Sequence, residues 1–197
     1  MATMIVGLVL FLGAHSMQVF AAPLRARIIK AAGEIPYKVV YSLISLGGLI
    51  LIAQGYTEWR FQGSPQLYTP PTWMVHIALL LNLFAFISLF ATYPPGYIKK
   101  ALKHPMITAV KIWALAHLLS NGDIASVVLF GAFLAWGVID RISVKRRERA
   151  GLTAPLDYKP KILADVVAVG VGTIVYVLFV WKVHLWLIGV SPIATSG

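Results

Sequence analysis

The chain contains no cysteine, and only 12% of its residues are charged. The absence of cysteine excludes disulfides, thiolate nucleophiles, iron–sulfur clusters and haem attached covalently through cysteine. A soluble domain carries about a quarter charged residues, so this chain has too little charge to cover a surface that faces water. Any metal or haem site must therefore be built from histidine, methionine, tyrosine or carboxylate side chains.

Hydrophobic residues instead make up 59% of the chain, and the mean hydropathy is +0.80. Since a spanning helix needs about 20 apolar residues, this composition predicts a polytopic membrane protein. The predicted fold is all-α, a transmembrane helical bundle of about six spanning helices in a single domain, residues 1–197. The six apolar stretches lie at roughly 3–22, 37–56, 73–93, 105–120, 124–140 and 162–188.

The fourth and fifth stretches are short for spanning helices, and only "SNGD" at 120–123 separates them. We interpret them as a tight helical hairpin that crosses the membrane twice. A re-entrant pair is the alternative. The first stretch has no basic residues before it, so we do not expect it to be a cleaved signal peptide.

Basic residues dominate the charge, with 17 Lys and Arg against 7 Asp and Glu, and they are unevenly distributed. Fourteen of them fall in three alternate loops, whereas the opposite loops hold only Arg60 and Lys182. This positive-inside pattern predicts cytoplasmic basic loops and both termini outside the cytoplasm. Topology and anionic lipid thus account for the positive charge, and no nucleic-acid partner is expected. The fourteen are Arg25, Arg27, Lys30, Lys38, Lys99, Lys100, Lys103, Arg141, Lys145, Arg146, Arg147, Arg149, Lys159 and Lys161.

Aromatic residues gather near the predicted outer ends of the stretches, as in an interfacial belt. His76 and His184 lie beside tryptophans there, and we expect both to be interfacial. Asp165, near the start of the last stretch, is expected to pair with Lys161. The predicted belt consists of Tyr56, Trp59, Tyr68, Trp73, Trp181 and Trp186.

Two histidines, His15 and His117, fall inside apolar stretches, where polar groups are candidates for function. His15 is ten residues from Arg25, and His117 is six residues beyond Lys111. Their helices run in opposite directions, so the imidazoles can reach a similar depth and bind one metal centre. Spacing alone leaves three interpretations open: metal or haem ligation, helix–helix hydrogen bonding and proton transfer.

The neighbours of His117 on one helical face are Trp113 and Asn121. Asn121 either orients a site or simply ends the helix. Trp113 either borders a ligand or only packs against other side chains. Lys111 either extends towards the cytoplasm or neutralises a carboxylate such as a haem propionate. In "KHP" at 103–105, proline suits the first turn of a helix, and His104 is expected at the interface.

"GLVLFLGAHS", "KHP" and "KIWALAHLLSNGD" together resemble the NnrU family of bacterial membrane proteins over roughly residues 1–190. That family is related to the 15-cis-zeta-carotene isomerases, which bind haem b. The resemblance implies a bacterial inner-membrane protein whose His15 and His117 ligate one haem b, with Lys111, Trp113 and Asn121 as further candidate cofactor contacts. Glycines follow the "HS" motif in the isomerases, whereas Met17 and Gln18 stand here, so the carotenoid pocket is in doubt.

Three function classes remain open. The first is a haem-dependent membrane enzyme or redox protein. Its ligand would be an apolar polyene, in carotenoid isomerisation, or nitric oxide, in nitrogen-oxide-linked redox metabolism. The second is a membrane accessory or assembly protein without chemistry. The third is a methyltransferase of the isoprenylcysteine type, suggested by "KHP" although "MITAVKIW" lacks the tyrosine and glycine that should follow. The sequence assigns no reaction, oligomeric state or protein partner.

Overall fold

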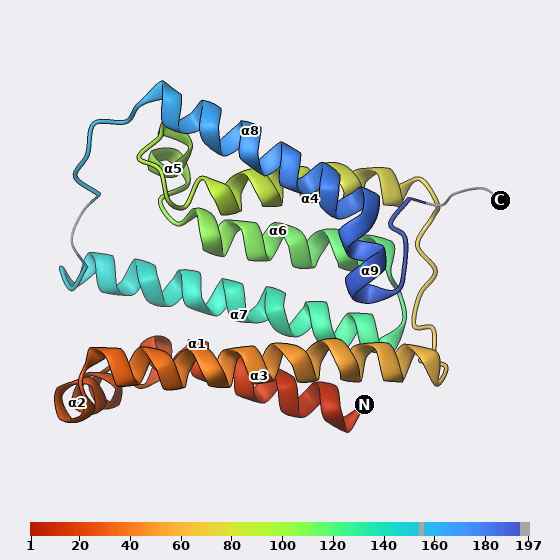
Figure 1. Ribbon diagram of the computed structural model, residues 1–197, viewed down its shortest axis with the longest axis horizontal. Coiled ribbons are helices and arrows are strands. Elements are labelled where there is room, and N and C mark those ends of the chain that lie inside the picture. The colour runs from red at the N-terminus through yellow and green to blue at the C-terminus, as the bar shows by residue number, and fades with distance from the viewer. Residues whose placement is uncertain (154–155, 194–197) are drawn as a thin grey trace.

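The computed structural model describes residues 1–153 and 156–193, and Gly197 at the C-terminus lies outside them. The chain is an all-α bundle of long antiparallel helices, as predicted (Figure 1). The helices are α1 (Ala2–Phe20), α2 (Ala22–Ala32), α3 (Glu34–Phe61), α4 (Met74–Phe90), α5 (Tyr97–Leu102), α6 (Pro105–Ser120), α7 (Ile124–Arg149) and α8 (Ile162–Leu178), followed by the π-helix η1 (Phe179–Val183) and α9 (His184–Ile188).

Four segments are long and apolar enough to cross a membrane: α1, α3, α7, and α8 together with η1 and α9. The helices α4 and α6 are shorter, with 17 and 16 residues. At a rise of about 1.5 Å per residue, α6 is roughly 24 Å long, less than the roughly 30 Å of a hydrocarbon core. The number of six crossings therefore stays a prediction.

The structure revises the expected connections, whereas the choice between a hairpin that crosses the membrane twice and a re-entrant pair stays a prediction. The helix α7 has 26 residues and runs the length of the bundle (Figure 1). It continues to Arg149, so the basic residues from Arg141 to Arg149, which were expected in a loop, are helical. The helices α2 and α5 were not expected, because each contains too few apolar residues to stand out in hydropathy.

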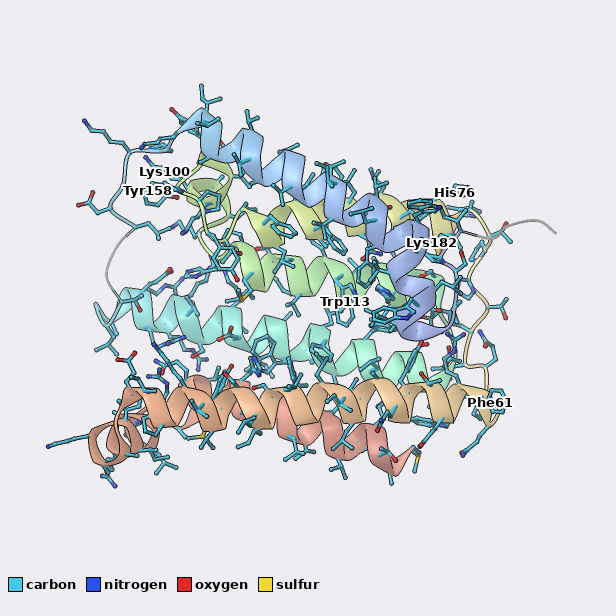
Figure 2. All side chains as sticks on the ribbon, in the orientation of Figure 1. Phe61, His76, Lys100, Trp113, Tyr158 and Lys182 are labelled. Carbon is cyan, nitrogen blue, oxygen red and sulfur yellow. The ribbon has the colours of Figure 1, made fainter. Side chains whose placement is uncertain are left out.

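The connections alternate between the two ends of the bundle, as the charge pattern predicts. The end with α2, α5 and the connection from α7 to α8 is called the basic end (Figure 1). The opposite end, which holds the N-terminus and the last described residues, is called the terminal end. Lys100 and Tyr158 lie at the first, and Phe61 and His76 at the second (Figure 2). The side of the membrane that each end faces stays a prediction.

Close packing of α1 against α3 depends on glycines, because without side chains two helix backbones can approach closely. A Cβ atom on Gly7 would lie 2.6 Å from the backbone nitrogen of Ile52. A Cβ atom on Gly48 would lie 2.9 Å from the backbone nitrogen of Phe11. These separations are too short for real contacts, so both positions need glycine at this helix spacing.

The helix α7 joins this pair to the rest of the bundle, since it packs against α1 and α3 on one side and α6 on the other (Figure 1). The helix α4 packs against α6 and α8. One buried apolar cluster spans α1, α3, α6 and α7, and it includes Met4, Ile52, Ala114, Phe130 and Phe133. The core therefore lies around α7.

At the basic end, two polar contacts fix the short helices. The Asp165 carboxylate accepts hydrogen bonds from the backbone N–H groups of Tyr97 (2.9 Å) and Ile98 (3.0 Å) at the start of α5. The expected pairing with Lys161 is wrong, since no such ion pair occurs within 1–153 and 156–193. His104, directly before α6, bonds through Nε2 to Glu148 of α7 at 2.6 Å. The "KHP" motif thus starts a helix, as predicted, and also ties α6 to α7.

At the terminal end, the loop 62–73 covers the turn between α6 and α7. The backbone N–H groups of Leu67 and Tyr68 donate to the Gly122 carbonyl at 2.8 and 3.2 Å. The Tyr68 hydroxyl donates to the carbonyl oxygens of Leu118 and Asn121. These bonds satisfy the carbonyl groups that the last turn of α6 leaves free.

Candidate functional site

A cavity of about 380 Å³ lies within the bundle towards the terminal end, and small-molecule sites have volumes of this order. Residues from α3, α4, α6 and α7 line it, together with the C-terminal segment from Tyr176 to Pro192. Most of the lining is aliphatic or aromatic. Its polar and basic side chains include Arg60, Asn82, His117, Asn121, Tyr176 and His184.

His117 lies on the cavity wall near the end of α6. Its imidazole stacks on Phe130 of α7, with ring centroids 4.3 Å apart, and the ring centroid of Trp113 lies 5.1 Å away on its own helix. The Nδ1 atom bonds to the Trp113 carbonyl oxygen at 2.8 Å. Because a carbonyl oxygen only accepts, Nδ1 carries the proton, and Nε2 of the neutral ring keeps its lone pair.

His184 also lines this cavity, from the start of α9. Its Nδ1 donates to the Val190 carbonyl oxygen at 2.6 Å, so the neutral ring has its lone pair on Nε2. The sequence placed both His184 and His76 at the interface. That expectation stays a prediction for both: His184 is partly exposed and also lines the cavity, a position the sequence did not reveal, whereas His76 is exposed at the start of α4.

His15 has the same local bond in different surroundings. Its Nδ1 donates to the Phe11 carbonyl oxygen at 2.7 Å. The ring stacks on Phe11, with centroids 4.2 Å apart, and packs near Tyr41 of α3 (5.2 Å) and Trp136 of α7 (6.0 Å). His15 is not among the described residues that line the cavity.

The structure therefore does not bring His15 and His117 to one point. His15 lies against Trp136 and His117 against Phe130, six residues apart on α7. At about 1.5 Å per residue, these levels differ by roughly 9 Å along the helix. Between the two imidazoles runs a series of aromatic rings with centroid separations of 4.2 to 5.6 Å: Phe11, Phe133 and Trp113.

Of the other predicted cofactor contacts, two line the cavity and one does not. Trp113 and Asn121 line the cavity, but Lys111 is not found in the described lining. The Lys111 stem instead packs on α7, where a Cβ atom on Gly137 would lie 2.8 Å from its Cγ. Asn121 follows the last residue of α6, and its amide donates to the His117 carbonyl oxygen at 3.0 Å rather than to the imidazole.

One polar network beside the cavity was missed from the sequence. The Tyr56 hydroxyl and Ser126 Oγ are 2.9 Å apart, and Ser126 Oγ donates to Asp123 at 2.6 Å. Arg60 donates to the Tyr56 oxygen at 3.3 Å and lies 3.6 Å from Asp123. Tyr56 is only 7% exposed, so its assignment to the interfacial belt is wrong. Two signals in the sequence could have revealed this network. Tyr56 and Arg60 are four residues apart on one helix, and Asp123 and Ser126 are three residues apart at a helix start.

The ligand chemistry of the cavity distinguishes a bare metal ion from a metal inside a macrocycle. No group of three or more His, Cys, Asp and Glu side chains that could hold a metal ion occurs among the described residues. The two imidazoles in the cavity are too few for a structural or catalytic site built from protein ligands alone. They fit a metal whose remaining positions are filled by a tetrapyrrole.

The sequence profile described as NnrU protein matches residues 3–192, nearly the whole chain. No curated protein and no solved structure matches the chain. On the extent of the profile match, the chain belongs to the NnrU family.

Proposed function

We propose that this protein is an integral membrane haem protein that holds haem b in the cavity beside α6, with His117 as an axial ligand. The observation that carries the proposal is the state of His117. Its Nδ1–H is bonded to the Trp113 carbonyl and its ring is stacked on Phe130. This bond fixes the tautomer and ring orientation that a metal ligand needs, as outer partners do in metalloproteins.

The walls of the cavity suit a flat apolar ligand with an acidic edge. Aromatic and aliphatic side chains from four helices and the C-terminal segment make up most of these walls. Arg60 is the one lysine or arginine in the lining that the structure describes. It replaces Lys111 as the candidate partner of a haem propionate, since a guanidinium pairs well with carboxylates.

The chain's own residues would set the chemistry of such a site. When bound, haem iron supplies one-electron chemistry or a coordination position for a small ligand. His117 would hold the iron through Nε2, while Trp113, Phe130 and Phe133 keep the surroundings dry. The apolar walls favour nitric oxide or a polyene over a charged substrate, so we propose a role in nitrogen-oxide-linked redox metabolism or polyene isomerisation.

Absorption of the purified protein tests this proposal. Protein made with ample haem supply should show a Soret band, and His117→Ala should abolish or shift that band. His76→Ala is the matched control, because His76 is an exposed histidine outside the cavity lining described here. A colourless wild-type protein would refute the proposal and favour a membrane accessory protein instead.

A further inference from the structure

We infer that the second axial imidazole of this site comes from His184 of α9, and not from His15 of α1. The inference rests on the proposed haem site and names the residue that completes it. It also assigns a role to the C-terminal segment 184–192, which would otherwise only close the cavity.

Placement is the first argument. Both His117 and His184 line the same cavity, although 67 residues separate them in the chain. His15 lies instead within a cluster of rings from α1, α3 and α7, about two helical turns along α7 from the level of His117. A tetrapyrrole held in this cavity would therefore lie beside His117 and His184, whereas His15 is not among the lining residues.

The tautomer of His184 is the second argument. Its Nδ1–H donates to the Val190 carbonyl oxygen at 2.6 Å, as that of His117 donates to the Trp113 carbonyl oxygen. In both neutral rings the lone pair is on Nε2, the atom that binds iron. His104 differs, because its Nε2 is bonded to Glu148 and is not free to bind a metal.

The π-helix η1 is the third argument, because it explains how His184 reaches the cavity. A π-turn adds one residue to the α-helical repeat, and such turns are frequent at functional sites. In an uninterrupted α-helix, at 100° per residue, His184 would lie roughly 80° around the axis from Tyr176, which lines the cavity. With one residue inserted the angle falls to roughly 20°, so His184 shares the face of Tyr176.

The coordination state of haem in the full-length protein tests the inference. Wild-type ferric protein in detergent should give the low-spin electron paramagnetic resonance signal of two axial imidazoles. His184→Gly should give a five-coordinate, high-spin signal and a shifted Soret band. Added imidazole should restore the low-spin signal, which a merely structural defect would not allow. His15→Gly and the exposed-site control His76→Gly should keep the wild-type spectrum.

Each outcome bears on one of the two proposals. The inference is overturned, while the haem site stands, if two results occur together. His15→Gly loses the low-spin signal and regains it with added imidazole, and His184→Gly keeps the low-spin signal without imidazole. If the wild-type protein binds no haem, the proposed function fails and the inference fails with it. If His184→Gly alone loses the low-spin signal and imidazole restores it, the ligand pair is His117 and His184.

Discussion

Replacing Gly7 by alanine should loosen the packing of α1 against α3. The new Cβ atom would lie 2.6 Å from the Ile52 nitrogen, 2.7 Å from the Gly48 oxygen and 2.9 Å from the Leu51 carbonyl carbon. All three are backbone atoms, so no side chain can rotate away. Ordinary contact begins at 3.4 Å, and the helices must therefore separate by about 0.8 Å (3.4 − 2.6) at this point.

The size of the effect follows from that separation. A gap of 0.5–1 Å removes about a quarter to a half of each dispersion contact, and overpacking of this kind typically costs about 1–3 kcal/mol. We expect Gly7→Ala to lower the free energy of unfolding by about 2 kcal/mol. Gly48→Ala needs a movement of only about 0.5 Å (3.4 − 2.9) and should cost about 1 kcal/mol.

The matched control is Gly13→Ala on the same helix, because nothing lies within 4 Å of a Cβ atom there. Alanine favours a helix over glycine by roughly 0.5–1 kcal/mol, so this variant should be as stable as wild type or more stable. Unfolding by sodium dodecyl sulfate in mixed micelles, followed by circular dichroism, measures the free energies. Equal stability of Gly7→Ala and Gly13→Ala would refute the close approach of α1 and α3.

Three further predictions concern the two ends of the bundle. Asp165→Ala should remove the carboxylate that caps α5 and lower the free energy of unfolding by about 0.5–2 kcal/mol. Asp157→Ala, in the exposed connection from α7 to α8, should leave it unchanged. Equal losses of the two variants in the sodium dodecyl sulfate titration would contradict the cap. Asp123→Ala should cost about 1–3 kcal/mol, because it leaves buried polar partners unsatisfied, and a neutral result in that titration would argue against the network. Alkaline phosphatase fused at Gly197 should be active in a bacterial host and inactive when fused at Ala150; the reverse pattern would invert the predicted orientation.

Hydropathy and helix-start signals predicted most of the fold. The apolar stretches correspond to the long helices, and α6 begins at Pro105 as expected. The amphipathic or polar pieces, α2 and α5, carry no long apolar run and were therefore missed. Asp165 was assigned to its nearest cation, whereas its partners are backbone groups 67 and 68 residues away, which no local pattern reveals.

The candidate site was harder to predict, because it depends on helix ends and rotation. His15 is five residues before the end of α1 at Phe20, and His117 is three residues before the end of α6 at Ser120. Because these helix ends lie at opposite ends of the bundle, similar distances along the sequence do not give one depth. The cavity-lining position of His184 was missed for a different reason: a π-turn rotates the following residues, and hydropathy is insensitive to that rotation.

The central position of α7 implies an order of assembly during synthesis. The pair α1–α3 is complete at Phe61, but α7 begins only at Ile124, 63 residues later. At about 5–20 residues per second, the ribosome takes roughly 3–13 s to reach it. During that interval the hydroxyl of Tyr56 lacks Ser126, its eventual partner on α7.

The loop 62–73 must also wait, because its backbone partners Gly122 and Asp123 are not yet made. Nascent chains stalled before α7 should therefore be cut within this loop by added protease, and completed chains should resist. The Tyr56 hydroxyl and the loop 62–73 thus gain their final hydrogen-bond partners only after the chain has been made as far as Ser126.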